Sequence, residues 1–238
     1  MAETHDKQLK EFKDEFNKEA EKMLRECFPK KVVELNSLLH SDVFQVAYSP
    51  LFPRMNKAGV DESCDDVNPI AKKRKLHDGA VLDGVTDGGI QGVSANRQIG
   101  EGIRRLKPEI ITLVTSCNKM KVWIQLLIPR IEDGNNFGVS IQEEILGEVS
   151  RVETDASSFL DHISRYYIAR GKLASKLLKY PTVEDYRIAV DELDEKQYVN
   201  LRLTLCEMRN IYSSLHDMIM KNLEKIKKPR SSRLETMY

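Results

Sequence analysis

Four long runs of apolar residues at helical spacing are the feature that most constrains how this chain can fold. They span residues 9–39, 99–127, 145–177 and 186–226. Within each run the apolar residues recur three and four positions apart, which is typical of helices that pack along a common seam. Helices of ~40 residues would be ~60 Å long, and such rods can bury their apolar stripes only against one another. The sequence therefore predicts an all-α fold, a long antiparallel four-helix bundle, without strands.

Single residues interrupt these runs. Pro29 should kink or restart the first helix, because proline cannot donate a backbone hydrogen bond. Pro108 leaves two possibilities open: the second helix either starts near that residue or bends there. Arg170 stands where the third run calls for an apolar residue. Pro181 ends the third helical run, and Thr182, directly after it, is expected to be the N-cap of the last helix.

The runs divide the chain into four parts. Residues 1–46 form the first helix of the bundle, and residues 47–97 form a flexible linker, because hydrophobic periodicity disappears there and Asp-Gly turn signals recur. Residues 98–228 form the other three helices, with a loop at 129–138. Residues 229–238 form a C-terminal tail after the last helix.

The linker carries a compact basic run. The run consists of Lys72, Lys73, Arg74 and Lys75. Exposed in a flexible linker, four consecutive basic residues are typical of a nuclear-import signal, and a solvated charge cluster is the alternative. We expect the protein in the nucleus, with some in the cytoplasm.

Composition narrows the class of partner. Among 238 residues, 37 are Lys or Arg and 37 are Asp or Glu, so the net charge is zero. This balance argues against a nucleic-acid partner, since such proteins usually carry a basic excess. No signal peptide and no apolar run of ~20 residues is visible, so no membrane partner is expected. Cys27, Cys117 and Cys206 lie in helical patterns and are expected to be small buried apolar residues.

A search for catalytic and metal-binding patterns finds none. A di-metal site in a helical bundle needs Glu-x-x-His pairs, and no histidine has an acidic residue three positions before it. The sequence also lacks a phosphate-binding P-loop, a zinc-ligand spacing and a Gly-x-Ser-x-Gly nucleophile motif. We therefore predict that the protein is not an enzyme and uses no metal or cofactor.

The loop between the second and third helices is more elaborate than a turn requires. Pro129 ends the helix before it, and its two glycines permit backbone angles that other residues resist. Charges of both signs, two asparagines and an aromatic ring make it a candidate contact site. The candidate residues are Arg130, Ile131, Glu132, Asp133, Gly134, Asn135, Asn136, Phe137 and Gly138.

The tail is a second candidate contact site. It ends on Thr236, Met237 and Tyr238, which place two large apolar side chains beside the free carboxylate. A carboxylate with an apolar anchor suits capture in a partner's pocket, whereas the simpler alternative is a frayed chain end.

Several segments resemble the 11S (REG) proteasome activators. The central block, residues 123–144, is similar to the signature of that family, and so are residues 28–31, 163–167, 183–187 and 222–230. The C-terminal tyrosine fits as well. The linker does not match closely, but its basic run resembles the gamma-type, nuclear member.

The resemblance implies a heptameric ring that caps the 20S proteasome core without ATP. The C-terminal tails would bind pockets of the core, and the 129–138 loop would be the activation loop that opens the gate. Phe137 would anchor the loop to the bundle, and Gly134 and Gly138 would set its backbone shape. We expect the polar contacts to be made or supported by Arg130, Glu132, Asp133, Asn135 and Asn136.

Two points stay open on sequence alone. Lys172 lies off the apolar stripe of the third helix and either lines the channel of the ring or is an ordinary exposed lysine. The alternative function is that of a nuclear helical scaffold or adaptor with no proteasome role, because a bundle alone does not define an activity.

Overall fold

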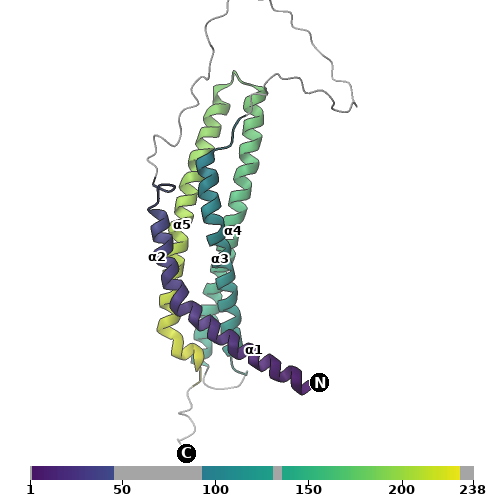
Figure 1. Cartoon of the computed structure of the whole chain (residues 1–238), viewed down its shortest axis with the longest axis vertical. Coiled ribbons are helices and arrows are strands. Elements are labelled where there is room, and N and C mark those ends of the chain that lie inside the picture. The colour runs from purple at the N-terminus through teal and green to yellow at the C-terminus, as the bar shows by residue number, and fades with distance from the viewer. Residues whose placement is uncertain (1, 46–92, 131–135, 231–238) are drawn as a thin grey trace, which may run out of the picture.

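The computed structural model describes residues 2–45, 93–130 and 136–230. The chain forms helices α1 (Ala2–Lys22), α2 (Phe28–Leu39), α3 (Arg97–Leu127), α4 (Phe137–Lys179) and α5 (Glu184–Lys227), with a π-helical turn over Met23–Cys27. Helices α2 to α5 lie side by side in one long bundle (Figure 1). The described part of the chain contains no strand. The predicted all-α four-helix bundle is thus confirmed.

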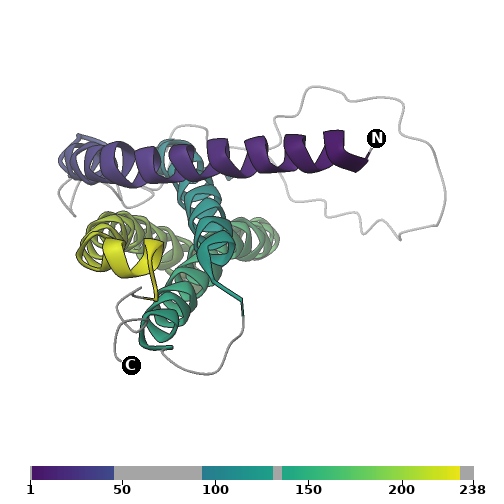
Figure 2. The same cartoon turned by 90° about the horizontal axis from the view of Figure 1, so that it is seen from below.

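The first predicted helix is divided as its proline indicated. The π-helical turn separates α1 from α2, and Pro29 occupies the first turn of α2, where the missing N–H would have no partner inside the helix anyway. Helix α1 turns away from the bundle axis and runs obliquely past α3 (Figure 2). Phe16 of α1 packs against the core, whereas Leu9 and Phe12 are 52% and 58% exposed.

Helix α3 resolves the question about Pro108. The helix begins at Arg97 and continues through the proline to Leu127. Asn96 caps its start, because its side-chain oxygen accepts hydrogen bonds from the backbone N–H groups of Gln98 (3.1 Å) and Ile99 (3.2 Å). The helix therefore starts well before the proline and passes through it.

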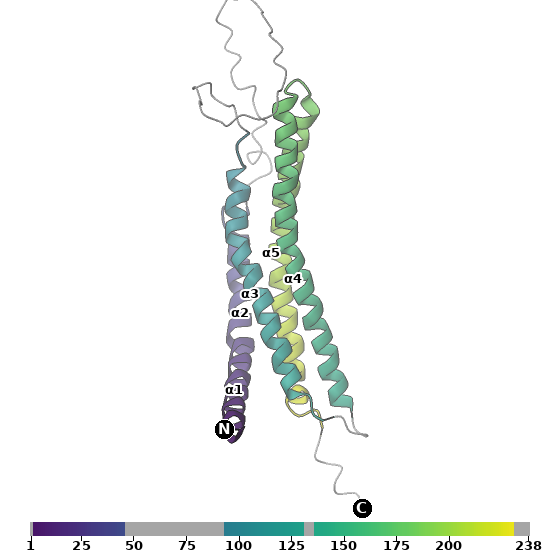
Figure 3. The ribbon, with the colours of Figure 1, turned by 90° about the vertical axis from the view of Figure 1, so that its right-hand side faces the viewer.

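The core runs along the length of the bundle. Helix α4 packs against both α3 and α5, and α2 packs against α5. Phe28, Trp123 and Tyr212 are fully buried, and the rings of Phe28 and Tyr212 meet edge to face with centroids 5.1 Å apart. Beyond the ends of α2 and α3, the α4–α5 pair continues alone (Figure 3). The single tryptophan thus has a packing role.

A charged network explains the arginine in the third run. The carboxylate of Asp194 on α5 accepts hydrogen bonds from Tyr166 Oη (2.9 Å), Arg170 Nε (2.8 Å) and Asn96 Nδ2 (3.2 Å). Arg170 also donates to the backbone carbonyl of Ser94 at 3.0 Å. Burial, together with this carboxylate, raises the pKa of Tyr166 well above its usual value, so the phenol remains a neutral donor. The network fastens the chain entering α3 to α4 and α5.

Two local expectations were wrong. Thr182 does not cap α5: the cap position is Val183, which makes no side-chain cap hydrogen bond. Cys27, the last residue of the π-helical turn, is exposed, whereas Cys117 is buried and Cys206 is partly buried. Among the described residues, none of the helices has the length and apolar character needed to cross a bilayer.

Candidate functional site

The antiparallel order of the last three helices brings the loop and the tail to one end of the bundle. Helix α3 ends at Leu127 there, α4 begins there at Phe137, and α5 ends there at Lys227 (Figures 1 and 3). The loop and the tail therefore leave the bundle from the same end. They are far apart in the sequence, since the loop starts at Pro129 and the tail ends at Tyr238, 109 positions later.

A single buried side chain joins the three helix ends. Gln142, in the second turn of α4, is fully buried. Its Nε2 donates to the carbonyl of Leu127 at 3.1 Å and to the carbonyl of Ile226 at 2.7 Å. Both carbonyls belong to the last turn of a helix, where no intrahelical donor is available. One amide group thus satisfies the C-terminal ends of α3 and α5 together.

Gly138 brings the start of the tail against the start of α4. A Cβ atom at this position would lie 2.1 Å from the carbonyl oxygen of Pro229 and 2.5 Å from its Cα. No side chain fits at such distances, so the chain leaving α5 crosses α4 at a place that only glycine permits. We expected Gly138 to supply unusual backbone angles; instead it lies in the first turn of α4, and the close approach of Pro229 explains the glycine.

Two exposed contacts continue this junction. Arg230 donates to Asn136 Oδ1 at 3.3 Å, and the ammonium of Lys225 lies 5.0 Å from the centroid of the Phe137 ring. Phe137, which we expected to anchor the loop to the bundle, is 68% exposed and therefore is not held by burial. A cation–π contact with α5 is what attaches this ring. We call the set formed by Gln142, Gly138 and Pro229 with these two contacts the loop–tail joint.

The structure describes only part of the predicted contact residues. Arg130 is exposed at the start of the loop, and Lys172 is exposed on α4. The remaining candidates lie outside the described residues. They are Ile131, Glu132, Asp133, Gly134, Asn135, Thr236, Met237, Tyr238, Lys72, Lys73, Arg74 and Lys75.

Sequence reasoning missed Gln142, although a signal was present. The residue precedes Ile145 by three positions and so lies on the apolar stripe of its helix. A polar side chain on a buried stripe needs hydrogen-bond partners, so its position in the sequence indicates a special contact.

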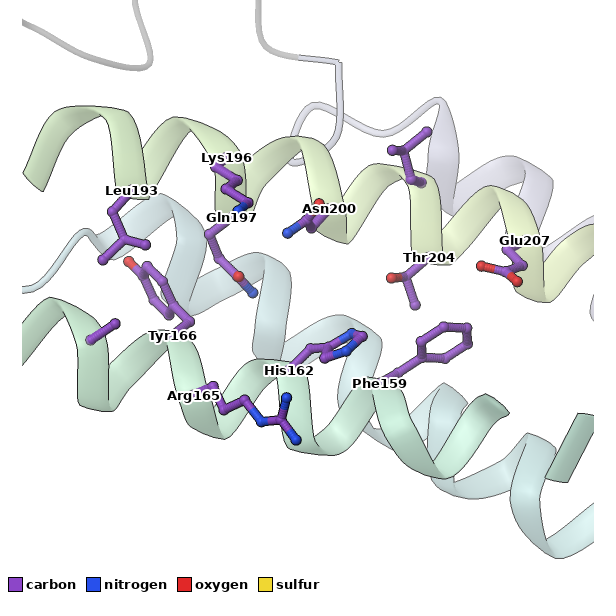
Figure 4. Close-up of a pocket in the computed structure, with 12 residues that line it drawn as sticks. Phe159, His162, Arg165, Tyr166, Leu193, Lys196, Gln197, Asn200, Thr204 and Glu207 are labelled. Carbon is purple, nitrogen blue, oxygen red and sulfur yellow. The ribbon is translucent and has the colours of Figure 1, made fainter. Parts of the chain in front are cut away.

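A groove of about 500 Å³ lies between α4 and α5, away from the joint. His162 and Arg165 of α4 and Lys196, Asn200 and Glu207 of α5 contribute to its polar lining (Figure 4). Across the described ranges, no three His, Cys, Asp or Glu side chains gather closely enough to hold a metal ion.

Comparisons with known proteins identify the family. The family model "Proteasome activator PA28, C-terminal" matches residues 92–236, and "Proteasome activator PA28, N-terminal" matches residues 3–51. Proteasome activator complex subunit 3 of Pongo abelii is 47% identical and that of Homo sapiens 46%, each over 95% of this chain and 93% of the relative.

A solved structure extends the likeness to three dimensions. The 11S subunit of the Plasmodium falciparum proteasome, PA28, is 35% identical, with a TM-score of 0.72 over 96% of this chain and 95% of that one. The mutated P26 activator, solved in complex with an archaeal 20S proteasome, shares the fold, with a TM-score of 0.55 at 16% identity over 61% of this chain and 73% of that one. Fold and sequence together define a helical-bundle proteasome activator. The chain belongs to the PA28 family.

Proposed function

We propose that this protein is an ATP-independent activator that caps the 20S proteasome core as a homo-heptameric ring. The observation that carries the proposal is the shared position of loop and tail at one end of the bundle. The tail residues Thr236, Met237 and Tyr238 bind the core, and the 129–138 loop holds the gate open. The protein performs no chemistry of its own and needs neither metal nor cofactor.

Exposed apolar side chains support assembly into a ring. Large apolar residues lie exposed on several helices. They include Phe12, Ile111, Tyr167, Ile168, Ile188 and Leu203. Side-by-side packing of copies would cover such faces, and a native mass of seven chains tests the ring size.

The ring explains how a short tail suffices for binding. One tail of a few residues binds weakly, but seven tails on one rigid ring raise the effective concentration and the avidity by orders of magnitude. Opening the gate additionally requires contacts that favour the open state over the closed one. The loop supplies these contacts at a height that the bundle fixes.

The decisive experiment mixes the purified protein with latent 20S core and a fluorogenic peptide, without ATP. Stimulated hydrolysis supports the proposal, and a correctly assembled ring that fails to stimulate the core refutes it. The alternative, a nuclear scaffold without a proteasome role, predicts no stimulation. Family membership disfavours that alternative.

Nuclear import through the basic run is part of the proposal. Replacing Lys72, Lys73, Arg74 and Lys75 together by alanine should move a fluorescently tagged protein from the nucleus toward the cytoplasm. Unchanged nuclear enrichment would remove this assignment.

Lys172 tests whether α4 faces the channel. If seven copies of Lys172 line it, the change Lys172→Glu reverses seven charges and should alter which fluorogenic peptides are hydrolysed fastest. An unchanged peptide preference identifies an ordinary exposed lysine.

A further inference from the structure

We propose that Gln142 is a positioning residue that fixes the activation loop relative to the tail, and so couples docking on the core to opening of the gate. This inference rests on the proposed activator function. It concerns a residue whose side chain is fully buried and so cannot itself touch the core; any effect of this side chain must act through the joint.

The first argument is the geometry of the amide. Its two N–H groups reach Leu127 O at 3.1 Å and Ile226 O at 2.7 Å, one carbonyl on each side of α4. The orientation of the amide is fixed, because the opposite flip would place its oxygen against two carbonyl oxygens. Leu127 is the last helical residue before the loop, and Ile226 lies in the last turn before the tail.

The second argument is that the two hydrogen bonds of Gln142 lie where the activation loop and the tail leave the bundle. Loop entry follows Leu127 directly, loop exit passes into the helix that carries Gln142, and the tail begins just after Ile226. A shift of either neighbouring helix along its axis would lengthen one of the two hydrogen bonds. The amide therefore opposes axial sliding, which apolar packing alone resists weakly because it is not directional.

Gly138 supplies a second, independent constraint. Pro229 lies so close to Gly138 that its backbone can approach α4 no further. The hydrogen bonds of Gln142 hold α5 toward α4, and the contact at Gly138 sets the limit of approach. Together they determine the height of the tail's origin relative to the loop. Seven tails docked on a flat core would then present seven loops at one level, as gate opening requires.

The test uses the full-length ring with the change Gln142→Met, which keeps side-chain size and removes both donors. The matched control is Gln197→Met, another buried glutamine, on α5 about 44 Å from Ile226 by helix rise. Native mass, thermal unfolding, affinity for latent core and maximal hydrolysis at saturating ring are measured for each.

We expect Gln142→Met to assemble and to bind the core within about threefold of the wild type. Its maximal stimulation should fall by about tenfold, equivalent to ~1.4 kcal/mol of lost preference for the open gate. Hydrogen exchange should accelerate in the last turn of α5, a local readout that needs no proteasome. Gln197→Met should keep full stimulation.

Full stimulation by saturating Gln142→Met overturns the proposal, and so does a loss explained entirely by weaker binding. If that variant fails to assemble, Gly138→Ala decides: its Cβ displaces Pro229, and stimulation equal to wild type would refute the joint. Failure of the wild-type ring to stimulate, with exchange still accelerated in Gln142→Met, would instead refute the proposed function and leave the joint intact.

Discussion

The bundle is held together by different chemistry in its two terminal regions. At the end where α4 connects to α5, the charged network centres on Asp194. This buried carboxylate accepts hydrogen bonds from an arginine, a phenol and an amide. At the opposite end, the loop–tail joint relies on the neutral amide of Gln142 and on the close contact at Gly138. Both regions tie a connecting segment to neighbouring helices.

The two regions have different roles: the charged network stabilises the fold, and the loop–tail joint fixes where the helix ends lie relative to one another. A buried charge without its partners is strongly unfavourable, so the network enforces one folded arrangement. A neutral amide contributes less energy, but its two hydrogen bonds define distances between three helix ends. Damage to the network should therefore reduce stability, and damage to the joint should reduce activity.

The largest effect should come from removing the segment that the joint presents. Deletion of Thr236, Met237 and Tyr238 should weaken binding to the core by at least ~100-fold, because avidity multiplies the loss over every tail. Stimulation should disappear with binding, while native mass and melting stay unchanged. Surface plasmon resonance on immobilised 20S core measures the affinity, and tight binding without the tail would contradict the tail's role.

The next effect should be confined to the loop. Asn135→Tyr places a bulky ring in the loop and should lower maximal stimulation by at least ~tenfold while the affinity for core stays within about threefold. Binding and peptide hydrolysis are measured on the same preparation. A variant that binds and still stimulates would show that the loop does not open the gate.

The charged network provides the contrasting case. Asp194→Ala strands the Arg170 guanidinium and should cost about 3 kcal/mol of folding free energy, lowering Tm by roughly 5–10 °C. Below its melting range the variant should stimulate fully. Asp217→Ala, which removes an exposed ion pair with Lys221, is the matched control and should change stability by less than about 0.5 kcal/mol. Lost activity in a folded Asp194→Ala ring would end the separation drawn above.

The smallest effect should come from the exposed rim of the joint. Lys225→Ala removes the cation above the Phe137 ring and should reduce maximal stimulation by about twofold, in keeping with the modest strength of an exposed cation–π contact. Lys221→Ala, one turn earlier on α5, should have no effect on stimulation. Equal maximal stimulation by the two variants would show that the contact between Lys225 and the Phe137 side chain does not contribute to the joint.

Periodicity in the sequence predicted the helices well but not their mutual register. The apolar runs located α2 to α5, and the break at Arg170 correctly signalled a special position. Its partner Asp194 could not be identified, because the pairing depends on how α4 slides against α5. Helix starts were harder: N-cap preference favoured Thr182, but α5 starts after Val183, which makes no side-chain cap hydrogen bond.

The residues of the candidate site could be predicted from the sequence, but the contacts that hold the loop and the tail in place could not. The loop and tail residues stood out by composition and by resemblance. Gln142 and the contact between Gly138 and Pro229 were not foreseen, since both join segments far apart in the chain. Polar residues on apolar stripes, such as Gln142 and Asp194, are the signal that would have located both special regions.

The position of Trp123 gives the protein a built-in optical reporter. It is the only tryptophan of the chain, it is fully buried, and it precedes Leu127 by one helical turn. Its emission colour depends on the polarity around the indole, so water reaching this end of the core would shift the spectrum to the red. A change in the nearby amide can thus be followed in the unlabelled protein, in real time.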